Sequence, residues 1–382
     1  MAPIASLRLV RWFCGLVLTL LAGTVGAQDL VSALREEVVS VRKAGLFDIE
    51  LETTYFRPPG DGPFPLIIIN HGKAMGNPKL DPRARFLVAA RELVQRGFAV
   101  VVPMRQGFSK SGGSYVGVGC NVHSNGLTQA EDVQVTLQSY AARPELDTRR
   151  VVVIGQSHGG LTTLALGALR LPQVVGLINF AGGLRQDQCT NWEAGLAEAF
   201  GRYGRETRIP ALFFYGDNDS YFSVSTWQAM VQAYRDSGAD VELVAFGTFG
   251  SDAHSLFSSR AGVKIWWPAV EGFLRKLGLP TEKRFDIRLV EHDVAVPPPS
   301  GFAELSNAQA LPGVGSAARE GYRAYLAADA PKAFAISAQG AWQWRSGVAD
   351  AIRSTLQRCA ERNQGKNCKL YAVDDHVVWT RE

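Results

Sequence analysis

The feature that most constrains the fold of this 382-residue chain is the run RRVVVIGQSHGG at residues 149–160. Residues 151–154 are apolar and β-branched, and Ser157 follows at the centre of G-Q-S-H-G. This order predicts a buried strand, a sharp turn and a helix that starts near Gly160. A serine on such a turn has a strained backbone, and its hydroxyl points out above the sheet. The free N–H groups of the helix start favour negative charge beside that hydroxyl.

The chain on either side of this run alternates between apolar, strand-like runs and helical patterns. The expected strands are residues 47–56, 65–70, 98–104, 174–183, 211–216 and 241–246. The expected helices are residues 81–96, 128–142, 161–169, 192–203, 225–236 and 261–277, with Thr128 as the cap of the second and Glu131 three residues on. Buried strands that alternate with helices predict an α/β fold with a doubly wound, mostly parallel sheet. A functional site is expected at the carboxyl ends of its strands.

The first 27 residues have the pattern of a secretory signal peptide. Arg8 and Arg11 precede the apolar run GLVLTLLAG, and V-G-A follows at residues 25–27. The apolar run is short for a bilayer span, although an uncleaved anchor is the alternative. We therefore expect a periplasmic or secreted protein without stable membrane insertion once the signal is removed.

Composition gives no sign of a nucleic-acid-binding protein. The formal net charge is +4, with 46% apolar and 20% charged residues, as in an ordinary globular protein. Two of the positive charges lie in the predicted signal, so no nucleic-acid partner is expected.

Four cysteines follow the predicted signal: Cys120, Cys189, Cys359 and Cys368. An even number in an exported chain indicates two disulfides, for which three connectivities are possible. Cys359 and Cys368 are close in sequence and are expected to pair, which leaves Cys120 with Cys189. Metal binding is the rival interpretation, but the chain has no C-x-x-C and no histidine at ligand spacing, so no metal is expected.

The pattern changes near Phe285. Residues 28–284 are expected to form the α/β domain, and residues 285–316 are rich in Pro and Gly and predict a linker. Residues 317–382 predict a small α+β module with a hairpin of AFAIS and AWQWRS, a helix at 350–362 and two further strands. The module contains no catalytic arrangement, which favours a packing or binding role toward an unknown envelope partner.

A nucleophilic serine needs a base to accept its proton and an acid to hold that base. Of the six histidines, His254 follows the last apolar strand in a loop that can reach over the strand ends. Asp219 ends the run YGDND and is the expected acid. Asp217 in the same turn is the alternative acid. Asp252 is a more distant candidate, and its position favours a role in shaping the loop of His254.

An oxyanion hole requires two donors. The backbone N–H of His158, the residue after the serine, is the first. The second is expected from the loop after residues 65–70, where the N–H of Lys73 in H-G-K is best placed. The same H-G-K is also compatible with a simple tight turn.

The runs NHGK, VVPMRQGFSKSGG, GQSHGG, YGDND and DAHSLF together resemble the α/β-hydrolase superfamily over roughly residues 45–280. The chain is most similar to its dienelactone-hydrolase-like and prolyl-oligopeptidase-like branches. The order Ser157, Asp219, His254 is the order of the triad in this superfamily. Dienelactone hydrolases use a cysteine nucleophile, so their substrate does not carry over to this serine. The segment before the first strand is too short for the propeller of oligopeptidases.

These patterns predict an exported serine hydrolase that cleaves small carboxylic esters, without a metal or organic cofactor. The alternatives are an exopeptidase or amidase with the same triad, or a non-catalytic envelope binding protein on a hydrolase scaffold.

Overall fold

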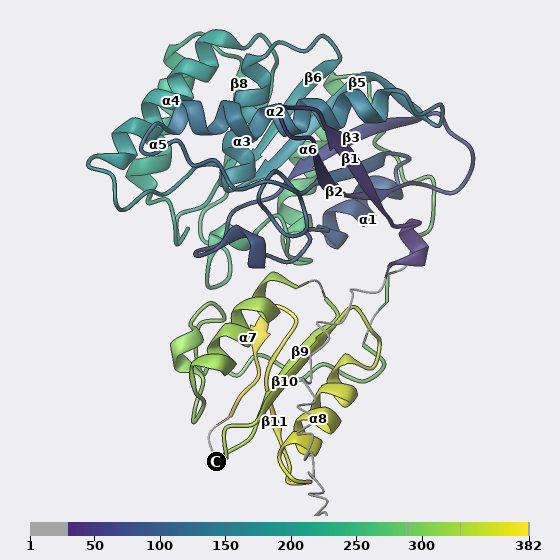
Figure 1. Cartoon of the computed structure of the whole chain (residues 1–382), viewed down its shortest axis with the longest axis vertical. Helices are drawn as coiled ribbons and strands as arrows, with labels where there is room; N and C mark the ends of the chain where they lie inside the picture. Colours follow the sequence, from purple (N-terminus) through teal and green to yellow (C-terminus); the bar gives the residue numbers. More distant parts are fainter. Residues whose placement is uncertain (1–29, 288, 291, 329, 381–382) are drawn as a thin grey trace, which may run out of the picture.

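The computed structural model describes residues 30–287, 289–290, 292–328 and 330–380. Figure 1 shows a larger α/β domain and a smaller domain with a sheet of its own. The predicted signal peptide, residues 1–27, lies outside the described residues. Among the described helices, none is both long enough and apolar enough to cross a bilayer.

Eight strands form the sheet of the larger domain in the order β1-β2-β4-β3-β5-β6-β7-β8. They are β1 (Glu37–Lys43), β2 (Ile49–Phe56), β3 (Phe64–Asn70), β4 (Ala99–Pro103), β5 (Leu146–Gln156), β6 (Val174–Phe180), β7 (Ala211–Tyr215) and β8 (Val241–Ala245). The pairs β1–β2 and β2–β4 are antiparallel, and the other neighbouring pairs are parallel. The predicted mostly parallel sheet is therefore confirmed.

Helices cover both faces of this sheet. They are α1 (Leu87–Val94), α2 (Val122–Ala141), α3 (His158–Ala168), α4 (Trp192–Glu206), α5 (Val224–Asp236) and α6 (Val263–Lys276), with short 3₁₀ turns η1 (Ser32–Leu34), η2 (Pro78–Leu80) and η3 (Ala253–Ser255). Alternate side chains of a strand point to opposite faces. In β3, Leu66 and Ile68 join the core beneath α2 to α5, whereas Ile67 and Ile69 join the core that contains α1 and α6. A strand buried on both faces has the continuous apolar run by which it was predicted.

The structure differs from the prediction at the start of α2. The helix begins at Val122, and the side chain of Asn121 accepts a hydrogen bond from the N–H of Ser124 at 2.9 Å. Thr128 lies inside the helix and donates to the carbonyl of Ser124 at 3.0 Å. The prediction that Thr128 caps the helix is wrong, because Asn121 already satisfies a first-turn N–H.

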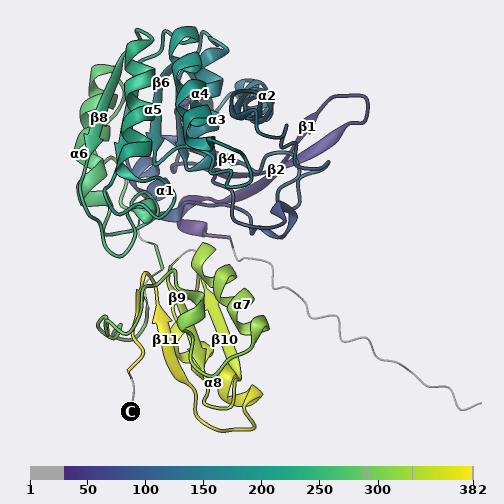
Figure 2. The same cartoon turned by 90° about the vertical axis from the view of Figure 1, so that its left-hand side faces the viewer.

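Two further elements differ from the expected ones. α1 covers only residues 87–94 of the expected 81–96. It starts late because Phe86 before it has a left-handed backbone with φ 50°. β1 is an edge strand that is absent from the expected elements. Exposed Val38, Ser40 and Arg42 alternate in it with more buried residues, as at the edge of a sheet. Figure 2 shows the β1–β2 hairpin projecting from one side of the larger domain.

Residues 285–316, expected as a linker, make contacts with both domains. The side chain of Ile287 is buried in the core that contains α1 and α6, and its carbonyl accepts a hydrogen bond from Arg91 Nε at 2.8 Å. Six residues later, the backbone N–H of Asp293 donates to the carbonyl of Ala349 in the smaller domain at 2.9 Å. The chain thus passes from one domain to the other within a few residues.

The smaller domain has an antiparallel sheet in the order β10-β9-β11-β12. Its elements are η4 (Ala308–Ala310), α7 (Ser316–Ala327), β9 (Lys332–Ile336), β10 (Trp342–Ser346), α8 (Ala351–Arg362), β11 (Lys369–Val373) and β12 (His376–Val377). The predicted hairpin is β9–β10, and the predicted helix is α8. Tyr322, Phe334 and Tyr371 are fully buried at the centre of its core.

Candidate active site

Ser157 occupies a strained turn between β5 and α3. Its backbone angles are φ 56° and ψ −127°, a region that non-glycine residues rarely adopt. Glycines allow this turn to pack tightly. A Cβ at Gly155 would lie 2.1 Å from the carbonyl oxygen of Gly159, and a Cβ at Gly159 would lie 2.0 Å from that of Asn70. The G-x-S-x-G pattern is therefore explained by backbone that approaches closely on both sides of the serine.

Asp219 and His254 form a hydrogen-bonded pair. His254 Nδ1 lies 2.9 Å from Asp219 Oδ2 and 3.1 Å from Oδ1. The Asp219 side chain is 0% exposed, and the His254 side chain is 13% exposed. Asp219 Oδ1 also accepts the backbone N–H groups of Tyr221 and Phe222 at 2.8 and 3.0 Å. The carboxylate is an acceptor, so Nδ1 of His254 is the donor of this bond and Nε2 is left for another partner.

The two other carboxylates considered as the acid, those of Asp217 and Asp252, lie elsewhere and do not bond to the His254 ring. Asp217 is exposed at the start of the turn after β7. Asp252 accepts the N–H of His254 at 2.9 Å and both the N–H and the hydroxyl of Ser220, at 3.1 and 2.7 Å. Asp252 therefore ties the turn that carries Asp219 to the loop that carries His254, the shaping role predicted for it.

The loop of His254 is also tied to the serine turn. The side-chain amide of Gln156, the residue before Ser157, donates to the carbonyl of His254 at 2.7 Å. Within the described part of the chain, the Ser157 hydroxyl has no hydrogen-bond partner, and the structure forms no bond from it to His254. Contacts of this kind often tighten only when substrate binds.

The predicted oxyanion donors lie on the two segments beside Ser157. His158 is the first residue of α3, where backbone N–H groups have no partner within the helix. Gly72, the residue before Lys73, packs against the serine, since a Cβ there would lie 3.2 Å from Ser157 Cβ. The Lys73 ammonium instead donates to the carbonyl of Ala74 and lies 5.6 Å from the ring centre of Tyr115.

Arg105 also lies in this region, and no role for it was predicted from the sequence. Its guanidinium is 0% exposed and donates to the carbonyl of His71 at 2.8 Å and to His158 Nδ1 at 3.2 Å. Burial, followed by the nearby Arg105 charge, holds the pKa of both histidines well below the ordinary value. The sequence signal that could have pointed to Arg105 is its place in VVPMR, directly after a run that predicts a fully buried strand.

The four cysteines form the two bonds that the sequence favours. Cys120 is bonded to Cys189, with Cα atoms 5.7 Å apart, and Cys359 to Cys368, with Cα atoms 6.0 Å apart. The first bond joins the loop after β4 to the loop after β6. The side chain of Gln186 adds a hydrogen bond to the carbonyl of Gly119 beside it, at 2.8 Å. Two loops at the carboxyl edge of the sheet are thereby held together.

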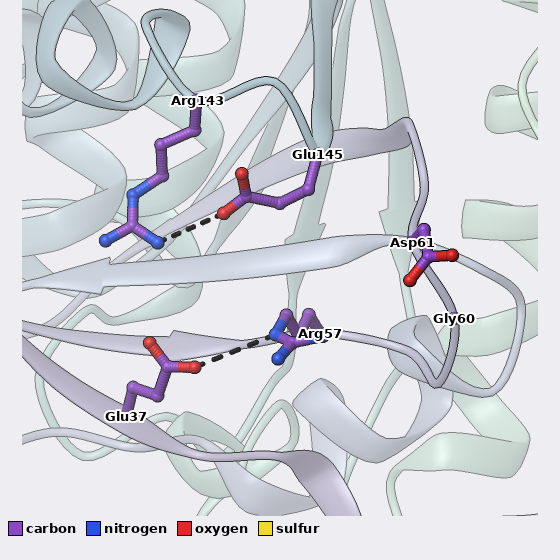
Figure 3. Close-up of a pocket in the computed structure, with 6 residues that line it drawn as sticks. All are labelled: Glu37, Arg57, Gly60, Asp61, Arg143 and Glu145. Carbon is purple, nitrogen blue, oxygen red and sulfur yellow. Dashed lines mark hydrogen bonds and ion pairs between the residues drawn. The ribbon is translucent and has the colours of Figure 1, made fainter.

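A charged pocket of about 300 Å³ lies elsewhere in the larger domain (Figure 3). It is lined by Glu37, Arg57, Gly60, Asp61, Arg143 and Glu145. Four of these residues lie just before β3 or β5, whereas Glu37 starts β1 and Arg57 follows β2. The pocket therefore lies at the edge of the sheet opposite Ser157. Among the described residues, no group of three or more His, Cys, Asp or Glu side chains is arranged to hold a metal ion.

Comparison with known proteins agrees with this geometry. Residues 66–239 match the family model described as serine aminopeptidase, S33. This match lies within the larger domain, whose mostly parallel sheet with helices on both faces has the α/β-hydrolase fold. No curated protein matches the chain.

Three solved structures with a similar fold are each less than 20% identical to this chain. A dienelactone-hydrolase-like protein from Klebsiella pneumoniae is 19% identical, with 63% of this chain and 99% of that chain covered and a TM-score of 0.47. An esterase from Pyrococcus furiosus is 16% identical, with 66% and 98% covered and a TM-score of 0.47. An acylaminoacyl peptidase from Pyrococcus horikoshii is 18% identical, with 66% and 43% covered and a TM-score of 0.47.

Proposed function

We propose that this protein is an exported carboxylesterase that works through Ser157, His254 and Asp219. The observation that carries the proposal is the buried Asp219–His254 pair at 2.9 Å, on a loop tied through Gln156 to the strained turn of Ser157. A hydrogen-bonded acid and base near a partly exposed serine on a strained turn are the parts that acyl transfer requires.

In the proposed reaction, Ser157 Oγ attacks the ester carbonyl while His254 Nε2 accepts the hydroxyl proton. Asp219 stabilises the imidazolium through Nδ1–H and keeps the ring in the productive tautomer. The N–H groups of His158 and Lys73 stabilise the tetrahedral oxyanion. Its collapse breaks the ester C–O bond, and His254 returns the proton to the leaving alcohol. Water then attacks the acyl-serine in the same way and releases the carboxylic acid.

Export is the second part of the proposal. Two disulfides in the described chain favour an oxidising compartment, because thiols in the cytosol are kept reduced. The signal pattern at residues 1–27 agrees with this compartment. The test is the N-terminal sequence of the protein recovered from an oxidising cell compartment, which should begin near Gln28.

A fluorophosphonate probe tests the nucleophile, because it reacts only with an activated serine. Wild-type protein should be labelled and Ser157→Ala should not. Ser220→Ala is the control, because it removes a different serine near the site and should still be labelled. Wild-type protein that stays unlabelled would favour the alternative of a non-catalytic binding protein on this scaffold.

An exopeptidase or amidase is the second candidate, favoured by the description of the matching family model as serine aminopeptidase. The same triad can cleave either bond. A panel of p-nitrophenyl esters and aminoacyl p-nitroanilides separates the two. We expect kcat/KM for the best ester to exceed that for the best anilide, and the reverse order would replace the esterase assignment with a peptidase.

A further inference from the structure

Arg105 places a fully buried positive charge behind the candidate site. It lies directly after β4 and Met104, and its guanidinium makes three hydrogen bonds. Nε donates to Gln129 Oε1 at 3.1 Å, and the two terminal nitrogens donate to the His71 carbonyl and to His158 Nδ1. All three acceptors are uncharged.

A buried guanidinium that is hydrogen-bonded only to uncharged groups is unusual, because buried charges are normally paired. Asp132, the anion that acts on it most strongly, has its carboxylate bonded to Lys43 Nζ at 2.6 Å and to the N–H of Gln106 at 2.7 Å. Burial lowers the pKa of Arg105 to about 10, so the group stays protonated near neutral pH. The positive charge is therefore not cancelled by a carboxylate in contact with it among the described residues.

The hydrogen bonds of Arg105 also fix the state of both histidines. His158 Nδ1 faces a pure donor and must accept, so Nε2 carries the hydrogen that it donates to Asn125 Oδ1 at 2.7 Å. His71 Nδ1 donates to the carbonyl of Gly72 at 2.7 Å, and its Nε2 accepts the backbone N–H of Arg105 at 3.3 Å. Both rings are neutral and locked.

These contacts join the two chain segments that flank the serine. His71 leads into Gly72 and Lys73, which carry one candidate oxyanion donor, and His158 carries the other. One side chain thus bridges both arms of the hole, and it carries a positive charge that no carboxylate among the described residues contacts.

We propose that Arg105 is a positioning residue that locks the two arms of the oxyanion hole and whose charge stabilises the tetrahedral oxyanion. This inference rests on the proposed serine hydrolase function. A fixed charge in a site of low dielectric constant stabilises developing charge strongly and needs no reorganisation during the reaction. Arg105 does not touch the substrate, so its loss should lower kcat and leave KM nearly unchanged.

Gln129→Glu separates the charge of Arg105 from its role as a bridge. The substitution keeps the shape of the side chain and places a carboxylate against Nε, while the bonds to His71 and His158 stay possible. A merely structural arginine would gain an ion pair and keep its kcat. We expect instead a fall in kcat of roughly 10-fold with KM within about twofold, because the positive potential is cancelled.

Arg105→Met removes both charge and bridge, and kcat should fall by roughly 100-fold. Arg105→Lys keeps the charge and should recover part of that loss. Arg96→Met is the matched control, because Arg96 is another buried arginine, bonded to Glu92 and to the carbonyl of Thr281 away from the serine. It should keep wild-type kcat even if the melting temperature falls.

The experiment measures kcat and KM on an ester, fluorophosphonate labelling and the melting temperature for the wild type and these variants. The inference would be overturned if folded Gln129→Glu or folded Arg105→Met kept the kcat of the wild type. In that case labelling of the wild-type protein would still support the serine hydrolase function. Wild-type protein that neither labels nor turns over would overturn both. If Arg105→Met does not fold, Gln129→Glu and Arg105→Lys decide the question.

Discussion

His254 Nδ1 lies 2.9 Å from Asp219 Oδ2, although 35 positions separate the two residues in the chain. The turn after β7 and the loop after β8 bring them together, and Asp252 fastens one loop to the other through Ser220 and the N–H of His254. The pair therefore depends on two adjacent parallel strands and on a third carboxylate that holds their loops.

This arrangement predicts a ranked effect of three Asp→Asn substitutions on ester hydrolysis. Asp219→Asn should lower kcat by roughly 10³- to 10⁴-fold, because an amide no longer selects the tautomer of His254. Asp252→Asn should cause a smaller loss by loosening the loop, and the exposed Asp217→Asn should stay near wild type. Steady-state kinetics on one ester gives the order, and a largest loss at Asp217 would show that the acid is misassigned.

The strained backbone at Ser157 predicts that the residue needed for activity lowers the free energy of unfolding. Ser157→Gly should raise the free energy of unfolding above that of Ser157→Ala by about 1 kcal/mol, because glycine adopts φ 56° without a Cβ penalty. Urea unfolding of the two inactive variants measures the difference. Equal stabilities would mean that the turn stores no strain at this residue.

Two of the buried histidines, His71 and His158, predict loss of stability as pH falls. His71 and His158 have lowered pKa values, chiefly through burial, so the unfolded chain binds protons that the folded chain excludes. Stability should be fully present above the unfolded pKa of about 6.5 and fall below it, by about 1.4 kcal/mol per histidine between pH 7.5 and 5.5. Unfolding curves at both pH values test this. His158→Asn should remove one histidine's share of the slope, and an unchanged slope would contradict the assignment.

The disulfides predict unequal effects on stability and on the site. Removing the Cys120–Cys189 bond, which closes a separation of 69 residues, should cost about 4 kcal/mol in the chain-entropy model, against about 2.5 for the Cys359–Cys368 separation of 9. Paired Cys→Ala variants of each bond provide the comparison. Only the first should also raise KM, since it joins loops at the carboxyl edge of the sheet. A KM change confined to the second pair would point to the smaller domain as part of the site.

The burial of Ile287 predicts where the hydrolase domain ends. A chain ended after Val290 should fold and keep Ser157 reactive toward a fluorophosphonate probe. A chain ended after Lys283 loses Ile287 from the core with α1 and α6, and its melting temperature should be several degrees lower. Probe labelling and thermal unfolding of both variants supply the readout. A folded but unreactive protein ended after Val290 would mean that the smaller domain helps to build the site.

Much of the larger domain could be predicted because its signals are local. The run at residues 151–160 combines β-branched residues, a serine between glycines and a helix start, and short-range sterics decide such a turn. The element boundaries were less predictable. Asn121 rather than Thr128 caps α2, and alternate side chains of β1 are exposed because it lies at the edge of the sheet. Capping and edge position depend on which neighbouring groups remain unpaired, and a sequence pattern does not show this.

The sequence by itself determined the strand–turn–helix around Ser157, the alternation that makes a parallel sheet, and the set of residues from which an acid and a base could come. Only the tertiary structure decided that Asp219 meets His254 while Asp252 holds the loops together. It also decided that Arg105 lies buried between His71 and His158, in contact with no carboxylate of the described chain. The physical reason is the range of the forces involved. Backbone sterics and side-chain periodicity act over a few residues, whereas the partners of a buried charge are set by which strands become neighbours.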